Sequence, residues 1–267
     1  MKWGKLILVV FGALVITALG IDAADTIHGS KGTLLSQVIS SRGGGCPSGM
    51  TPVETIPGIT CVDMYETSTG SACPSQNPEQ AAATQQNLSD GKCIGESKKS
   101  TLPWRFITRD QAMQMCARSG KRLPTSEEWY QLSLGMVNVE SVCNVDSKKV
   151  SESGAYSECA SPSGAYDMVG NIWEWVSDDV INGNYKTGVL PGTGFVAQVD
   201  ASGMATVVSE EKQELFENDY FWSRTDGAYG IVRGGYYDSG KDAGIYSVHA
   251  DTPPTTAGTG IGFRCVK

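Results

Sequence analysis

The residues best suited to contacting another molecule lie near the C-terminus. Between Arg233-Gly234-Gly235 and Gly262-Phe263-Arg264-Cys265 the chain is dense in Tyr, Ser, Gly, Asp and His. Tyrosine rings offer rigid amphipathic contact area, and short polar side chains offer adaptable hydrogen bonds. A fixed frame around exchangeable residues favours a binding surface. A solvated, turn-rich terminal hairpin would have the same composition, so both interpretations stay open at this point.

The candidate contact residues fall between positions 236 and 258. The tyrosines are the expected aromatic anchors, with partial burial in the frame as the alternative for Tyr237 and Tyr246. The polar side chains at 238, 239, 242, 249, 251 and 252 are expected to face solvent. The full candidate set is Tyr236, Tyr237, Asp238, Ser239, Asp242, Tyr246, His249, Asp251, Thr252, Thr256 and Gly258.

Residue types for zinc or histidine chemistry are scarce. The chain has only two histidines, His28 and His249, and no Cys-x-x-Cys pair. The sequence therefore lacks the histidine and cysteine ligands of a zinc site, and it has few histidines that could serve in a catalytic triad. The formal net charge is -8 and no Lys/Arg cluster is present. A nucleic-acid partner is not expected, because phosphate binding requires a basic surface.

The N-terminus indicates export. Residues 1–21 comprise a short basic leader and an uncharged, mostly apolar run from Leu6 to Ile21. This pattern is typical of a signal peptide, with small residues at Ala18 and Gly20 for cleavage. A spanning helix needs about 20 apolar residues, so an N-terminal membrane anchor is the alternative. We therefore expect a secreted or cell-surface protein that contacts a membrane only through this segment, if it is uncleaved.

A stalk and one folded domain are expected to follow. Residues 22–45 are polar and contain Gly43-Gly44-Gly45, which predicts a flexible stalk, and residues 46–267 have the composition of a folded domain. Capping boxes predict two helices, one from Thr108 to Gly120 and one from Thr125 to Gly135. Residues 80–99 are interpreted as an exposed insertion, and residues 182–219 as loop-like.

Four ordered motifs resemble one known family. They are Ser119–Trp129 (SGKRLPTSEEW), Gly164–Trp175 (GAYDMVGNIWEW), Val232–Gly235 (VRGG) and Ile261–Cys265 (IGFRC). Together they resemble the formylglycine-generating-enzyme, or sulfatase-modifying factor, domain, over residues 46–267. The resemblance implies an α+β domain of the C-type lectin type. Its expected features are two helices, small twisted sheets, much irregular backbone and stapling by disulfides.

All eight cysteines are expected to pair. An even number in an exported chain favours disulfides over metal thiolates. The family resemblance implies a bridge from Cys116 to Cys265, which in the chain-entropy model stabilises by about 4 to 5 kcal/mol. The other expected pairs are local in sequence: Cys46 with Cys61, Cys73 with Cys93, and Cys143 with Cys159.

The enzyme chemistry of the family is not expected here. Its enzymes use two cysteines after Arg-Gly-Gly to bind copper, and those positions fall near Ser239 and Gly244. Neither residue can replace a thiolate, so we expect no copper and no enzymatic activity. A related branch holds iron with histidines, and the folded region has only His249 for that role.

A calcium site of the family is matched by residue type. The resemblance places the ligands at Asp167, Gly170, Ile172 and Glu174, through two carboxylates and two backbone carbonyls. Oxygen-only ligands with two formal charges suit Ca²⁺. The alternative is that Asn171 and Glu174 are hydrogen-bonded core residues, and both interpretations stay open.

The C-terminal segment resembles a narrower group, the variable proteins of diversity-generating retroelements. Their frame of Arg-Gly-Gly, Ala-Gly-Val/Ile-Phe/Tyr, Pro and Val/Ile-Gly-Phe-Arg is present here in similar spacing. The resemblance implies a non-catalytic protein with a hypervariable C-terminal face for a protein or cell-surface ligand. The first alternative is a non-diversified structural or carbohydrate-binding surface domain. A copper-dependent oxidase is the second, and the sequence does not specify the oligomeric state.

Overall fold

The computed structural model describes residues 45–136 and 139–267. The predicted signal or anchor segment and residues 22–44 of the predicted stalk lie outside the described residues. Among the described residues, no helix is long and apolar enough to cross a membrane. Residues Cys46–Lys267 form one compact unit, which is α+β and is held by disulfides.

Short strands and one helix precede the two capped helices. Strands β1 (Met50–Pro52) and β2 (Cys61–Asp63) form one antiparallel pair, and β3 (Thr67–Thr69) and β4 (Gly95–Ser97) form another. Helix α3 (Ala81–Ser89) lies between β3 and β4 in the chain. The segment 80–99 therefore differs from the expected exposed insertion. It is ordered, and its buried Asn87 hydrogen-bonds both backbone groups of Ser75.

The two predicted helices are confirmed. Helix α4 (Arg109–Arg118) begins at a capping box in which Thr108 and Gln111 exchange hydrogen bonds. Helix α5 (Ser126–Ser133) begins in the same way, with Thr125 and Glu128. A short helix, α6 (Val139–Val142), was not predicted. The capping boxes satisfy backbone N–H groups that a helix start leaves without intrahelical partners.

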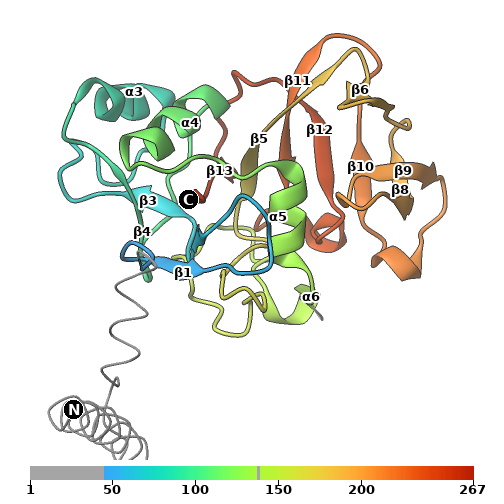
Figure 1. Cartoon of the computed structure of the whole chain (residues 1–267), viewed down its shortest axis with the longest axis horizontal. Helices are drawn as coiled ribbons and strands as arrows, with labels where there is room; N and C mark the ends of the chain where they lie inside the picture. Colours follow the sequence, from blue (N-terminus) through green and yellow to red (C-terminus); the bar gives the residue numbers. More distant parts are fainter. Residues whose placement is uncertain (1–44, 137–138) are drawn as a thin grey trace, which may run out of the picture. The chain divides into compact units, whose positions relative to one another are not determined.

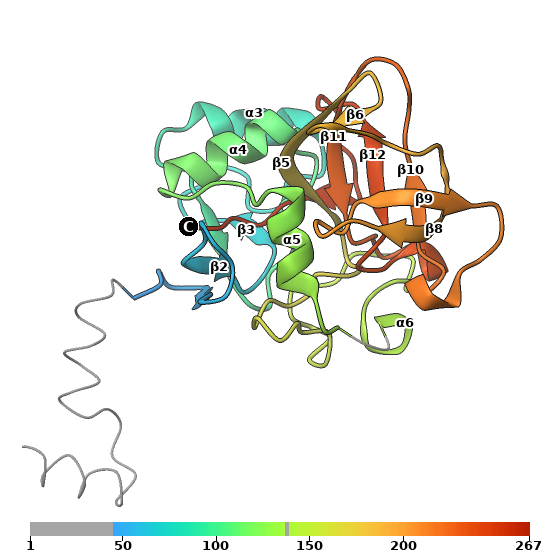
Figure 2. The same cartoon turned by 45° about the vertical axis from the view of Figure 1, so that its right-hand side comes forward.

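The largest sheet of the domain has nine strands, and it is larger than the small sheets that the sequence predicted (Figures 1 and 2). Eight of its strands lie in the order β7-β6-β5-β11-β12-β10-β8-β9, and β13 pairs with β5. The bounds are β5 (Trp173–Ile181), β6 (Asn184–Tyr185), β7 (Gly188–Val189), β8 (Gly194–Val199), β9 (Ala205–Ser209), β10 (Tyr220–Trp222), β11 (Ala228–Arg233), β12 (Val248–Thr252) and β13 (Ile261–Gly262). The segment 182–219, predicted to be loop-like, thus supplies β6 to β9 and the short 3-10 helix η1 (Glu214–Phe216).

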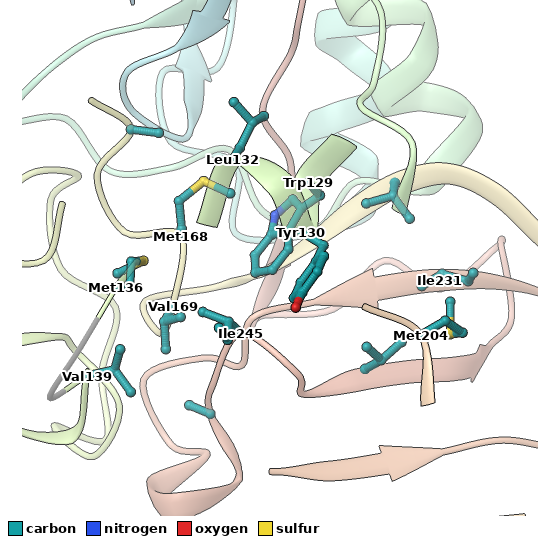
Figure 3. Packing of buried hydrophobic residues seen from close by; sticks show 14 of the residues in the cluster. Trp129, Tyr130, Leu132, Met136, Val139, Met168, Val169, Met204, Ile231 and Ile245 are labelled. Atoms are coloured by element: carbon teal, nitrogen blue, oxygen red, sulfur yellow. The ribbon is translucent and has the colours of Figure 1, made fainter. Parts of the chain in front are cut away.

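The sheet separates two hydrophobic cores. One contains Trp129 and Tyr130 of α5, packed with Met204, Ile231 and other residues that Figure 3 shows. The other contains Ala112 and Met115 of α4, packed with residues that include Trp173, Trp175, Val232 and Phe263. Strand β5 contacts both helices. Alternate side chains of β5 therefore enter opposite cores, as the two-residue period of a strand requires.

The four expected disulfides are present. They link Cys46 to Cys61, Cys73 to Cys93, Cys116 to Cys265 and Cys143 to Cys159. The Cys116–Cys265 bridge spans 149 positions and joins α4 to the residues after β13. It closes the C-terminal segment onto the α4 side of the sheet.

Candidate functional site

The candidate segment contains a central strand of the sheet. Strand β12 lies between β11 and β10 and pairs with both. A solvated terminal hairpin would have one free edge, so that interpretation is wrong for this segment. The residues expected to contact a partner therefore project from the middle of a packed sheet and from the turns around it.

The Arg233-Gly234-Gly235 frame is rigidly held. The Arg233 guanidinium is buried, donates to Ser126 Oγ at 2.7 Å and to the Gly203 carbonyl at 3.1 Å, and lies against Trp129. Both glycines have positive φ, and a Cβ on Gly234 would lie 2.4 Å from the Met168 carbonyl. Only glycine fits such positions without strain.

The turn after the frame is braced from outside the segment. The Ser239 hydroxyl accepts a hydrogen bond from the Tyr236 N–H at 3.0 Å. Lys148 donates its backbone N–H to the Tyr237 carbonyl at 3.0 Å, and its ammonium lies 2.6 Å from the exposed Asp238 carboxylate. Ser239 thus has a structural contact, whereas Asp238 keeps an exposed side chain in a surface ion pair.

A buried aspartate anchors the next turn, which follows the 3-10 helix η2 (Gly240–Asp242). Asp219 Oδ2 accepts the Tyr246 N–H at 2.7 Å, and Gly244 packs directly against the same carboxyl group. Burial costs this carboxylate its hydration and raises the pKa of Asp219 to about 8. The Tyr246 ring packs against Tyr130 and Phe216, on the α5 side of the sheet. Tyr246 therefore matches the alternative given for it, a partly buried residue of the frame, and its role as an anchor stays a prediction.

Alternation along β12 divides its side chains between the two faces. His249 and Asp251 are half-buried on one face, with their side chains 30% and 26% exposed. Val248, Ala250 and Thr252 are buried on the other. The expectation that Thr252 faces solvent is wrong, because it shares the inward face of the strand. Asp242 lies outside this strand, on the exposed side of η2.

Aromatic side chains from other strands surround His249. Its ring stacks on Trp222 of β10 with centroids 4.0 Å apart, and meets the edge of Trp173 of β5 at 5.0 Å. His249 Nδ1 lies 2.9 Å from Asp251 Oδ1. The sequence analysis missed Trp222 as a contact residue. The signal available was the alternation of Tyr220-Phe221-Trp222, which places two aromatic rings on one face of a strand.

The remaining candidates lie along the loop that leads to β13. Tyr236 is half-buried at the edge of the α4-side core, and its ring packs against Gly260. Tyr237 contacts Tyr236 edge-on, and its hydroxyl lies 3.5 Å from Thr259 Oγ1. Thr256 and Gly258 are half-buried in the same loop. Because Gly260 also accepts the Trp173 N–H, this loop adjoins the face that carries His249.

Glu174, one of the four residues proposed to bind calcium, forms an internal ion pair with Arg264. Both carboxylate oxygens of Glu174 accept hydrogen bonds from the Arg264 guanidinium at 2.6–2.9 Å, and Oε2 also accepts the Trp129 indole N–H at 2.7 Å. Asp167 Oδ2 accepts the Gly154 N–H at 2.6 Å. The described residues contain no group of three or more His, Cys, Asp or Glu side chains arranged to hold a metal.

A third carboxyl group faces the same guanidinium. Glu66 is fully buried, accepts hydrogen bonds from Ser153 and Asn171 through Oε2, and has no partner at Oε1. Burial raises the pKa of Glu66 well above its ordinary value, and the nearby carboxylates add to this shift. Burial likewise raises the pKa of Asp167 to about 6. The alternative of a hydrogen-bonded polar core around Asn171 and Glu174 matches this geometry, and thermal melts in calcium test the predicted calcium site.

We expect the melting temperature to be the same in calcium as in chelator. A cation at 100 times its dissociation constant adds about 2.7 kcal/mol, which is about 5–10 °C for a domain of this size. Arg264 already neutralises Glu174, so we expect no shift of that size. Thermal melts of the chain and of Asp167→Asn, each in calcium and in chelator, provide the measurement. A rise in calcium that Asp167→Asn abolishes would restore the calcium site.

Comparison with known proteins assigns a family to the part of the chain that carries this site. Residues 135–267 match the sulfatase-modifying factor enzyme 1-like domain. This part of the chain therefore resembles the domain of that family. Hercynine oxygenase of Mycolicibacterium smegmatis is 26% identical over 153 residues, which are 50% of this chain and 30% of that protein. The chain therefore spans about a third of the length of this relative.

Solved structures also resemble the chain. The Major Tropism Determinant I1 variant is 17% identical, with a TM-score of 0.43 and coverage of 82% of this chain and 55% of that one. Treponema denticola variable protein 1 is 11% identical, with a TM-score of 0.43 and coverage of 83% and 92%. CarF is 15% identical, with a TM-score of 0.42 and coverage of 78% and 85%.

The two positions at which enzymes of the family carry copper-binding cysteines fall near Ser239 and Gly244, within the two turns described above. Ser239 caps the turn at Tyr236, and Gly244 packs against Asp219. All eight cysteines are paired in disulfides. A thiolate nucleophile or thiolate metal ligand therefore has no free cysteine to supply it.

Proposed function

We propose that this chain is an exported, non-catalytic binding protein whose C-terminal segment recognises a protein or cell-surface partner. The surface involved comprises Tyr236, Tyr237, His249 and Asp251, with Asp238 at its edge. These side chains come from one strand and from the turns next to it. They are half-buried or exposed, as contact residues must be before a partner arrives.

One observation carries the proposal: the segment combines a fixed backbone with replaceable side chains. Buried Arg233, two positive-φ glycines and the Cys116–Cys265 bridge hold the backbone. His249 and Asp251 project from the same backbone toward solvent, while Val248 and Ala250 project into the core. A sequence change at Asp251 or His249 therefore alters the outward surface while Val248 and Ala250 keep their places in the core, and a change at His249 also removes its stack on Trp222.

Residue chemistry supports a non-catalytic role. Copper-dependent oxidation of a substrate cysteine requires thiolates, and serine or glycine cannot supply the soft ligands. Ser239 and Gly244 instead serve the backbone of two turns. The resemblance of the terminal frame to retroelement variable proteins supports the further idea that positions 236–260 are diversified. An adenine-variant copy of these codons beside a reverse transcriptase gene would distinguish this from a non-diversified surface domain.

We expect four outward positions to tolerate simultaneous replacement. Surface substitutions at Asp238, Asp242 and Asp251 should change stability by about 0.5 kcal/mol or less each, and loss of the His249 ring from its stack on Trp222 should cost about 0.5 kcal/mol. The variant Asp238→Asn, Asp242→Ser, His249→Asn and Asp251→Ser should therefore lose about 2 kcal/mol, or up to about 8 °C in melting temperature. Calorimetry or a circular dichroism melt gives the measurement.

The matched control is one inward residue on the same strand. Thr252→Asp places a carboxylate on the buried face of β12, which costs more than the four outward changes together because the charge has no partner there. A fourfold variant less stable than Thr252→Asp would show that the outward residues are structural. The alternative of a non-diversified structural or carbohydrate-binding surface domain would then replace the proposed function.

A further inference from the structure

The carboxyl group of Asp219 is completely buried without a cation beside it. The residue is 0% exposed, and no Lys, Arg or His pairs with it in the part of the chain that the structure describes. Oδ2 accepts the Tyr246 N–H at 2.7 Å, whereas the buried Oδ1 has no hydrogen-bond partner. The Ser247 hydroxyl also lies near this carboxyl group, but it donates to the Asp242 carbonyl at 2.6 Å. A buried carboxylate without a counter-charge is strongly disfavoured in its ionised form.

The groups packed around Asp219 favour its neutral form. Burial raises the pKa of this carboxyl group, and repulsion from Glu217, the residue after η1, raises it further. Tyr246 presents its backbone N–H to the carboxyl group, while its phenol ring packs beside Tyr130 of α5. Strand β8 contributes the backbone N–H of Val196, which donates to the main-chain carbonyl of Asp219. The one charged side chain among these neighbours is thus another carboxylate.

The turn formed by residues 243–247 is in direct contact with this carboxyl group. It connects the 3-10 helix η2 to β12 and therefore determines where β12 begins. A Cβ on Gly244 would lie 2.0 Å from Asp219 Oδ1, so the backbone of the turn covers the unpaired oxygen. The next residue, Ile245, is buried in the core that contains Trp129 (Figure 3). Water can therefore hydrate the carboxyl group only when the turn opens.

We propose that Asp219 is a proton-controlled latch for the turn 243–247, closed while the carboxyl group is neutral and released when it ionises. The neutral group still accepts the Tyr246 N–H through Oδ2 and carries its proton on Oδ1. Ionisation places a charge beneath the turn, and opening of the turn gives that charge access to water. The proton leaves to solvent. The C-terminal segment is therefore held more firmly in acidic than in alkaline surroundings.

Opening of the turn is expected to increase as the pH rises. In the closed turn the pKa of Asp219 is about 8, whereas in the open turn the hydrated carboxyl group has an ordinary pKa of about 4. Between these values opening releases one proton, so the opening equilibrium constant rises about 10-fold per pH unit. Stability from the neutral contact is fully present below about pH 4 and is lost as the pH rises to about 8.

Hydrogen exchange at single amides, followed by NMR, measures this opening. The exchange rate of the Tyr246 N–H, divided by its rate in an unfolded chain at the same pH, gives the opening constant. Between about pH 5.5 and 7.5 we expect this ratio to rise about 100-fold. The Thr256 N–H belongs to a different turn of the C-terminal segment and donates to the Pro253 carbonyl, so its ratio should stay constant. Equal pH dependence at the two amides, or no change at Tyr246, would overturn the proposal.

Two variants separate the effect of the carboxyl group from that of the turn. Asp219→Asn keeps an oxygen acceptor for the Tyr246 N–H but cannot ionise, so the ratio at Tyr246 should change less than about 3-fold over the same range. The matched control is Asp200→Asn, because Asp200 also accepts backbone N–H groups, those of Ser202 and Met204, but is exposed. This variant should keep the full rise.

A rise that survives Asp219→Asn would assign the pH dependence to another group and contradict the latch. If Asp219→Asn does not fold, the comparison of the Tyr246 and Thr256 amides in the unmodified chain still decides the question. The inference goes beyond the proposed function, and its test requires no binding partner. It can therefore fail while the proposed function holds, and the reverse.

Discussion

Replacing Cys116 and Cys265 together by alanine is expected to lower the melting temperature by about 10–20 °C. The bridge closes a span of 149 positions. In the chain-entropy model, a loop of that length stabilises the folded state by about 5 kcal/mol. Each kcal/mol corresponds to about 2–4 °C for a domain of this size. Both sulfur atoms are also buried in the α4-side core, so their loss adds a packing cost.

The Cys46–Cys61 bridge is the matched control. It spans 15 positions, for which the same model gives about 3 kcal/mol, and Cys46 is only half-buried. Thermal melts of the two double-alanine variants should therefore place the long-bridge variant lower. A lower melting temperature for the variant without the Cys46–Cys61 bridge would contradict this prediction. The C-terminal segment would then be held mainly by its strand pairing and its other contacts rather than by the disulfide.

Replacing Arg264 by methionine is expected to cost about 3–5 kcal/mol of unfolding free energy at pH 7. Breaking a buried ion pair leaves an uncompensated charge, which costs this much in known cases. Here the guanidinium faces three carboxyl groups, those of Glu66, Asp167 and Glu174. Its removal leaves the buried carboxyl groups without their shared cation. Glu174→Gln should cost less, because Arg264 then keeps two acidic neighbours.

The stability lost in Arg264→Met is expected to depend on pH. Without Arg264, the folded-state pKa values of Glu66 and Asp167, which burial already raises, lie further above their unfolded values. A group of this kind contributes stability that is present at low pH and is lost as the pH rises through its folded-state pKa. The deficit of Arg264→Met relative to the unmodified chain should therefore shrink between pH 7 and pH 5. Urea unfolding at both pH values measures it, and a constant deficit would show that lost packing, not charge, is the cause.

The sequence could predict features that rest on local chemistry. The capping boxes at Thr108 and Thr125 specify helix starts through hydrogen bonds within one turn, and both helices begin where expected. The Arg233-Gly234-Gly235 frame was predicted from its motif. The disulfides could be predicted because each partner was either implied by the family resemblance or near in sequence.

Features that rest on distant pairing could not be predicted in the same way. Strands β6 to β9 are short and lie among glycines, and their order in the sheet depends on neighbours from elsewhere in the chain. Thr252 has the residue type of an exposed position, but the register of β12 turns it inward with Val248 and Ala250. A shift of one residue would reverse that assignment. Trp222 became a candidate only when β10 was placed beside β12.

Selection from a library tests the central claim most directly. The library is the chain displayed on yeast, with positions 238, 242, 249 and 251 randomised and the frame, including Thr252, kept constant. Sorting against a panel of unrelated purified proteins measures binding, and melts of the selected variants measure stability. We predict variants that bind different proteins, differ only at these four positions and melt within about 8 °C of the parent. The contrary result is a library in which folded members bind no target, or in which every binder has lost the fold.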